Sequence, residues 1–331
     1  MDLSHCTLCP RVCGADRTRG TGRCGAGMLP RLARAALHRW EEPCISGDDP
    51  RRGSGTVFFS GCPLGCRFCQ NYPISKENFG KEVPVSRLAE IFLELQDQGA
   101  WNINLVSATQ YIPQVVEALD LIKGRLHIPV VWNTGGYEKM ETLRLLEGYV
   151  DIYLPDLKFF DPALADICAA APDYFAVASA AIPEMLRQVG PIRLGEDGML
   201  RRGVMVRHLV LPGQRKDSEK LLKWLAEAVP VEQLYLSLMS QYTPTRPMPL
   251  ESPGTPHERA FSHSVVTPED SEQVVKALNR RVATFEYNWV RDIAGELGFS
   301  GYGQERTSAK EEYTPPFDLT GVERPEQEET V

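Results

Sequence analysis

Strand-like and helix-like segments alternate six times between residues 55 and 241, and this order restricts the possible folds more than any other feature. The strand-like segments are apolar and rich in β-branched residues, and they cover residues 55–62, 102–109, 128–136, 150–159, 201–213 and 234–241. Helical patterns separate them; residues 85–99, for example, place Leu88, Ile91 and Leu95 on one face. A repeated strand-then-helix order requires right-handed crossovers and a parallel sheet. We therefore predict an α/β fold whose six β/α units form a partial (β/α)6 barrel.

Three other segments fall outside this alternation. Residues 1–54 are rich in Cys, Gly and Arg, and we expect them to form a small metal-binding subdomain before a barrel and C-terminal helix at 55–303. A long Pro-rich stretch at 241–264 is typical of a lid or binding loop, or of disorder. Residues 304–331 are acidic and contain proline, so we expect a disordered tail.

The charge, the apolar content and the cysteine distribution of the chain exclude some classes of protein. The chain has 331 residues, of which 43% are hydrophobic, and its formal net charge is −8 without a Lys/Arg-rich block. Phosphate backbones attract basic surfaces, so nucleic acid is not an expected partner. The N-terminus lacks the pattern of a signal peptide, and the sequence lacks an apolar run of about 18 residues, so we expect a cytoplasmic protein without a membrane span. Eight of the nine cysteines precede residue 70, which favours metal or redox chemistry over disulfides.

Cys62, Cys66 and Cys69 follow the first strand of the alternation with C-x3-C-x2-C spacing. Structural zinc and ordinary iron–sulfur clusters use four protein ligands, so three thiolates predict a metal centre with one open position. The alternatives are a zinc loop or three unrelated buried cysteines. In a parallel sheet, loops that follow the strands gather at the carboxyl edge, where function concentrates.

A second cysteine set has C-x2-C-x3-C-x10-C spacing and comprises Cys6, Cys9, Cys13 and Cys24. Four thiolates can close a site, and both zinc and an auxiliary iron–sulfur cluster fit this donor set. Cys44 is a candidate alternate ligand, whereas Cys168 lies in an apolar run and is expected in the core.

The residues Cys62, Cys66, Phe68 and Cys69 resemble the C-x3-C-x-aromatic-C motif of the radical S-adenosylmethionine (radical SAM) superfamily. The resemblance implies a [4Fe-4S] cluster on the three thiolates and S-adenosylmethionine on the fourth iron. It also implies an electron donor of the flavodoxin or ferredoxin type, and cleavage of the sulfonium to a 5′-deoxyadenosyl radical that abstracts hydrogen. Within the superfamily the chain looks like relatives of pyruvate formate-lyase-activating enzyme, in the segments CTLCPRVCGADRTRGTGRCGAG, FFSGCPLGCRFCQNYPIS and VRHLVLPG.

Polar residues near the strand ends are candidate contacts for the cofactor, and with Phe68 they are Ser107, Thr109, Asn133, Asp156, Lys158 and His208. Activases of the resembled family have a glycine-rich segment where this chain has Ser107-Ala108-Thr109, and an Asp-Leu-Lys segment that is matched at residues 156–158. The Asp–Lys pair could also be an internal ion pair, and His208 could be a core histidine because it alternates with valines. The sequence leaves two kinds of substrate open: a glycine of a partner protein, as in an activase, or a small molecule. A metal-binding or electron-transfer module without catalysis is the alternative function.

Overall fold

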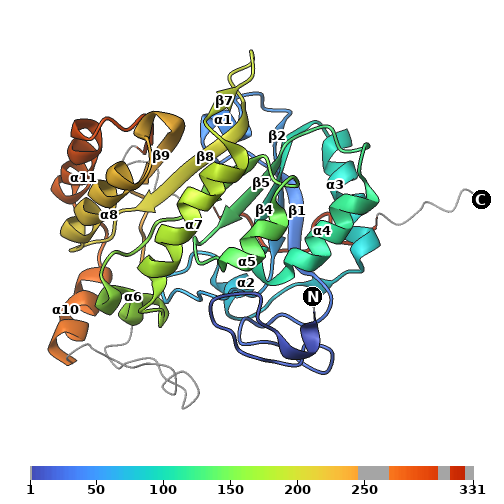
Figure 1. Ribbon diagram of the computed structural model, residues 1–331, viewed down its shortest axis with the longest axis horizontal. Helices are drawn as coiled ribbons and strands as arrows, with labels where there is room; N and C mark the ends of the chain where they lie inside the picture. The colour runs from blue at the N-terminus through green and yellow to red at the C-terminus, as the bar shows by residue number, and fades with distance from the viewer. Residues whose placement is uncertain (1, 245–267, 305–313, 325–331) are drawn as a thin grey trace, which may run out of the picture.

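The computed structural model describes residues 2–244, 268–304 and 314–324 (Figure 1). Within these residues, six parallel strands lie side by side in chain order, which confirms the predicted α/β fold with a mostly parallel sheet. They are β2 (Gly53–Phe59), β4 (Ala100–Val106), β5 (Val130–Thr134), β6 (Ile152–Pro155), β8 (Leu200–Leu209) and β9 (Leu234–Met239). The sheet continues in parallel to β10 (Gly301–Gly303) beyond β9.

The other strands pair antiparallel. β1 (Arg31–His38) runs beside β2, and β3 (Lys81–Glu82) lies outside β1. β7 (Arg193–Leu194) pairs with the start of β8. The sheet therefore extends into residues 1–54, which the sequence assigned to a separate subdomain, and β2 begins two residues before the expected boundary at residue 55.

Helices follow the parallel strands as the alternation predicts. The longer ones are α3 (Val85–Asp97), α4 (Ile112–Leu121), α6 (Pro162–Ala169), α7 (Tyr174–Val189), α8 (Arg215–Ala228), α10 (Pro268–Leu278) and α11 (Thr284–Glu296). The short ones are α1 (Pro43–Ser46), α2 (Tyr72–Ser75), α5 (Met140–Leu143), η1 (Leu3–His5), η2 (Thr109–Tyr111), η3 (Arg144–Leu146) and η4 (Val231–Gln233). α7 begins earlier than the sequence pattern indicated, because its first turn includes Tyr174, whose side chain is fully buried.

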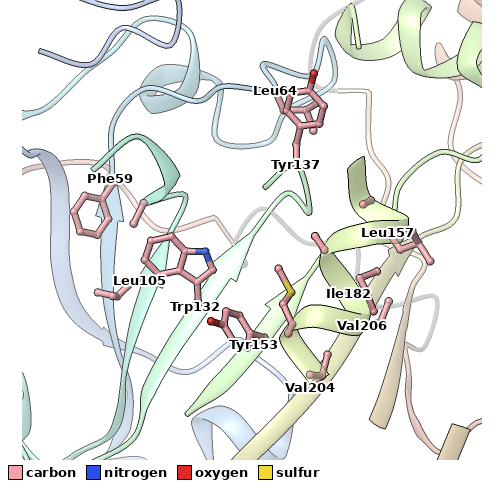
Figure 2. Close-up of a cluster of buried hydrophobic side chains, with 14 of the residues drawn as sticks. Phe59, Leu64, Leu105, Trp132, Tyr137, Tyr153, Leu157, Ile182, Val204 and Val206 are labelled. Carbon is pink, nitrogen blue, oxygen red and sulfur yellow. The ribbon is translucent and has the colours of Figure 1, made fainter. Parts of the chain in front are cut away.

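Alternate side chains of each strand face opposite sides of the sheet. One side packs against the helices and forms the main core, which Figure 2 shows in part, with Trp132 and Tyr153 from the sheet and Ile182 from α7. The other side faces the lumen of the partial barrel. There Val131, Ile152, Leu154 and Met205 pack around Cys44 and Ile45 of α1. The N-terminal segment therefore fills the lumen towards the amino ends of the strands, where Figure 1 shows α1.

The expected disordered tail is wrong for residues 314–324. The Leu319 N–H donates to Ala33 O at 3.0 Å, and the Ala35 N–H donates to Thr320 O at 2.8 Å. Val322 is 1% exposed, and the buried Arg87 donates to its carbonyl at 3.2 Å. The acidic composition of the tail predicts disorder, but a few apolar residues within it pack against β1 and α3. Most of the Pro-rich stretch at 241–264 lies outside the described residues.

No single helix among the described residues has the length and apolarity to cross a membrane. The pair α6 and α7 meets that test by length and composition, but the two helices are bent by 98° at the break between them.

Candidate functional site

The loop that carries Cys62, Cys66 and Cys69 leaves the carboxyl end of β2 through a tight turn. Gly61 at this turn has a φ of +82°, a conformation that favours glycine. The Gly61 N–H donates to Ile74 O at 2.7 Å, and the Cys62 N–H donates to Cys24 O at 3.0 Å. The loop is thus fixed on one side by α2 and on the other by the N-terminal segment, and all three lie at the same end of the molecule in Figure 1.

The three thiols are largely enclosed: Cys66 is buried, and Cys62 and Cys69 are half-buried. Burial raises the pKa of the Cys66 thiol to about 12 and also raises that of Cys69. Because metals bind the thiolate, a cation that enters this loop must displace protons.

The donor set fits an iron–sulfur cluster, since thiolates are the ligands that such clusters require. The described residues contain no group of three or more His, Cys, Asp or Glu side chains arranged to hold a single metal ion. A [4Fe-4S] cluster places each cysteine on a different iron, so its three thiols need not converge on one point.

Asp156 and Lys158 follow the end of β6 and form an ion pair, with Lys158 Nζ 2.5 Å from Asp156 Oδ2. Their side chains are 23% and 18% exposed, so a ligand can still reach both. Burial has the largest single effect on the pKa of Lys158 and lowers it, but Asp156, Cys66 and Tyr174 together outweigh burial and hold that pKa above its ordinary value. Lys158 therefore carries its charge beside the Cys66 thiol, whose pKa it lowers against the effect of burial.

The cysteine loop and this ion pair both come close to Gly135, which follows the end of β5. A Cβ added at Gly135 would lie 3.4 Å from Leu64 Cδ2 and 3.7 Å from Lys158 Cε. Leu64 of the loop and Lys158 of the β6 end are therefore both neighbours of the same glycine.

The hydroxyl of Tyr174 holds the segment around Asp156 in place. It accepts the Lys158 N–H at 3.0 Å and lies 2.8 Å from Asp156 O and 2.9 Å from Gly135 O. Tyr174 is fully buried at the start of α7. Sequence reasoning missed this residue, since a Tyr in the first turn of a helix gives no sign of which loop its hydroxyl reaches.

Ser107, at the end of β4, has a φ of +58°, in the left-handed region that residues other than glycine seldom adopt. Ser107 therefore takes a backbone conformation that is typical of glycine. Its N–H donates to Asn133 O at 2.9 Å, so Ser107 and Asn133 are neighbours at the carboxyl edge. Both residues are half-buried.

Three other candidates point into the core. Thr109 is 3% exposed and donates to Glu138 Oε1 at 2.6 Å. His208 is 2% exposed, with Nδ1 2.6 Å from Leu157 O and Nε2 2.8 Å from Ser218 Oγ, and burial lowers its pKa to about 4. Phe68 is half-buried, with edge-to-face contacts to Phe159 and Tyr242. This geometry favours the core-histidine interpretation of His208, and gives Thr109 a role in holding Glu138.

The four N-terminal cysteines gather in one place. Cys6, Cys9, Cys13 and Cys24 together line a small cavity with Arg17 and Gln110. Burial raises the pKa of Cys9 to about 12 and that of Cys24 to about 11. Cys44 lies elsewhere, in the core of the lumen on α1, so the structure separates it from this set. Cys168 is fully buried in the main core, as expected.

Two N-terminal arginines that sequence reasoning missed tie this segment to the barrel. Arg11 donates to Pro63 O at 3.0 Å and to Ala169 O at 2.8 Å, so it bridges the cysteine loop and the end of α6. Arg17 is 1% exposed and donates to Gln110 O at 2.7 Å, and the Gln110 side-chain amide donates to Gly61 O at 3.0 Å. No pattern in the sequence distinguishes these two arginines from those on the surface.

The sequence profile of the Radical SAM superfamily matches residues 56–225, which is just over half of the chain. The uncharacterized protein MJ0674 of Methanocaldococcus jannaschii is 27% identical over 252 residues, which cover 73% of this chain and 67% of that protein.

Two solved structures are similar at lower identity. A radical SAM methyltransferase from Sphaerobacter thermophilus is 14% identical with a TM-score of 0.49, over 78% of this chain and 67% of that one. Streptococcus suis SuiB bound to the precursor peptide SuiA is 11% identical with a TM-score of 0.47, over 74% of this chain, which spans only 46% of SuiB. On the match to its sequence profile, the chain belongs to the radical SAM superfamily.

Proposed function

We propose that this protein is a radical SAM enzyme in which Cys62, Cys66 and Cys69 hold a [4Fe-4S] cluster. Superfamily membership implies the cluster, S-adenosylmethionine and radical generation. The observation that carries the ligand assignment is the placement of the cysteine loop beside the Asp156–Lys158 ion pair, at the carboxyl edge of the parallel sheet. This edge is where α/β folds gather their functional groups.

When bound, the cluster and S-adenosylmethionine supply reductive cleavage of the sulfonium, which yields methionine and a 5′-deoxyadenosyl radical for hydrogen abstraction. The protein's part is to bind and orient. The Lys158 ammonium and the Asp156 carboxylate complement the carboxylate and amino groups of the methionine moiety. Ser107 and Asn133 add hydroxyl, amide and backbone groups at the neighbouring strand ends. Tyr174 fixes the backbone that carries the ion pair.

We further propose that Cys6, Cys9, Cys13 and Cys24 hold a second metal centre. Zinc and an auxiliary iron–sulfur cluster both use four thiolates, and the cluster agrees better with these cysteines, because the described residues contain no Cys group arranged around a single metal ion. The described part of the segment before β1 contains only η1 as regular structure, so a metal is a suitable means of ordering it. Its position supports a structural role, because Cys24 O accepts the Cys62 N–H and thereby supports the radical loop.

For the substrate, we propose a glycine of a partner protein, as in a glycyl-radical activase. This proposal is supported by the way in which the lumen is filled: α1 packs against the inner side chains of the sheet towards the amino ends of the strands. Arg207 reinforces this filling, with Nε 3.0 Å from Glu42 Oε1. A substrate therefore approaches from the carboxyl edge, as an extended protein loop can. Transfer of deuterium from a glycine-labelled partner into 5′-deoxyadenosine tests this step, and a lack of transfer would contradict it.

The ligand assignment is tested on protein reconstituted without oxygen. We expect a cluster whose EPR spectrum changes when S-adenosylmethionine is added, together with formation of 5′-deoxyadenosine. Cys66→Ala should abolish both, while the matched control Cys168→Ala should leave both nearly unchanged, because Cys168 lies in the apolar core. The opposite pattern, or a cluster that ignores S-adenosylmethionine, would refute the proposal.

A further inference from the structure

A cavity of about 470 Å³ lies between the N-terminal segment, the cysteine loop and the end of α6. Its volume lies in the range of ligand-binding clefts. The residues that line it are Arg11, Cys13, Ala15, Thr21, Gly22, Arg23, Cys62, Pro63, Leu64, Gly65, Arg67, Lys76, Ala169 and Ala170.

The lining is strongly cationic. Arg11, Arg23, Arg67 and Lys76 contribute four positive charges, and the described lining includes no Asp or Glu. The chain as a whole carries a net charge of −8, so this concentration of positive charge runs against its composition. The guanidinium of Arg11 donates to the backbone carbonyls of the cysteine loop and of the end of α6, and these uncharged acceptors leave its positive charge uncompensated.

Lys76 brings one of these charges directly onto the cysteine loop. It is exposed at the end of α2, and its Nζ would lie 2.7 Å from a Cβ added at Gly65. Gly65 has a φ of +65°, a backbone conformation that favours glycine, and the missing side chain leaves room for the Lys76 ammonium.

The cavity touches both cysteine sets but not the proposed cofactor contacts. Cys62 of the loop and Cys13 of the N-terminal set both line it, whereas Ser107, Asp156 and Lys158 are not among its described lining residues. A substrate for hydrogen abstraction must reach the cofactor contacts. A donor of electrons must instead approach the cluster ligands, and Cys62 offers that approach.

We propose that this cationic cavity is where an acidic electron-carrier protein docks to reduce the cluster. The inference rests on the proposed function and adds the location of its electron donor. One electron passes from the reduced carrier to the cluster near Cys62, so the carrier is oxidised by one electron and the cluster is reduced by one, without transfer of atoms. An acidic carrier fits because opposite charges steer association and orient the partners.

The test compares two charge reversals that change the net charge of the protein equally. Lys76→Glu places a negative charge in the cavity, while Lys123→Glu does so at an exposed site after α4 that is not among the lining residues. The probe is a purified acidic flavodoxin, and its binding to the reconstituted full-length protein is measured by calorimetry at low and at moderate salt. We expect Lys76→Glu to weaken binding about 2- to 30-fold at low salt, the range for losing one exposed ion pair and gaining one repulsion. Lys123→Glu should bind like the wild type.

A second measurement separates docking from catalysis. Reduction of the cluster by dithionite and the resulting 5′-deoxyadenosine should be the same in both variants and the wild type, since a small chemical reductant does not need the docking surface. If dithionite yields no 5′-deoxyadenosine in the wild type, the proposed function fails, and the binding data still report on docking. Equal flavodoxin affinity in the two variants would overturn the docking proposal. The docking proposal would also be overturned if the wild-type protein bound inorganic phosphate in the cavity but did not bind flavodoxin.

Discussion

Replacing Tyr174 by Phe tests whether one buried hydroxyl positions the Asp156–Lys158 segment. The hydroxyl accepts the Lys158 N–H and lies within hydrogen-bond distance of the Asp156 and Gly135 carbonyls. Phe keeps the ring in the core but leaves the Lys158 N–H without its partner. An unsatisfied buried donor costs about 1–3 kcal/mol, which corresponds to about 5- to 150-fold faster local opening. We therefore expect faster hydrogen exchange at the Lys158 amide and slower cleavage of S-adenosylmethionine.

Tyr137→Phe is the matched control for this prediction. The Tyr137 ring lies 6.2 Å from that of Tyr174 in a stacked arrangement, but its hydroxyl donates to the Asp173 carboxylate at 2.8 Å. The same chemical change thus occurs nearby without touching the Lys158 amide. Hydrogen exchange resolved to single residues, on the reconstituted protein, provides the comparison. Equal protection of Lys158 in both variants would refute a positioning role for Tyr174.

Three further changes probe the supports of the site. Gly61→Ala would place a Cβ 2.3 Å from Cys24 O at a φ of +82°, so we expect less iron per protein after reconstitution, and a normal iron content would contradict this. Burial raises the pKa of Glu138, so its contribution to stability is present below the unfolded carboxyl pKa of about 4.3 and is lost as pH rises through the folded pKa. In the wild type we therefore expect the melting temperature to fall as pH rises from about 4, and this fall should be smaller in Glu138→Gln. An equal fall in both proteins would show that Glu138 does not cause it. Phe317→Ala should lower the free energy of unfolding by about 1–2 kcal/mol, somewhat less than for a fully buried ring, because Phe317 packs on Phe58 and is only partly exposed. Wild-type stability would show that the tail is not anchored there.

The alternation of strands and helices was predictable because its signals are local. Each of the six parallel strands is a short apolar run followed by a helical pattern, and their order along the chain is also their order in the sheet. The cysteine loop could be placed at the carboxyl edge for the same reason, since it follows the first of these strands directly. β1 could not be predicted in this way, because it pairs antiparallel and lies outside the alternation of strands and helices. Its sequence, RLARAALH, is also equally typical of a helix.

The fine structure of the site depended on long-range contacts that a sequence does not display. His208 and Thr109 have residue types suited to a cofactor contact, but the hydrogen bonds of His208 to Leu157 and Ser218 take both ring nitrogens. Whether a side chain at a strand end faces the lumen or the helices changes with a shift of one residue. The alternation of His208 with Val204 and Val206 did contain this information, since both valines belong to the helix-covered core.

The two cysteine sets form one structural unit through contacts of the backbone. Cys24 O accepts the N–H of Cys62, so a ligand candidate of one set directly supports a ligand candidate of the other. Arg17 and Gln110 provide a second link, from the N-terminal segment to the carbonyl of Gly61. Both links end on the same peptide group, which joins Gly61 to Cys62. A change in the conformation of the N-terminal set must therefore move the loop or break these hydrogen bonds, which gives the segment before β1 a structural role in holding the cysteine loop.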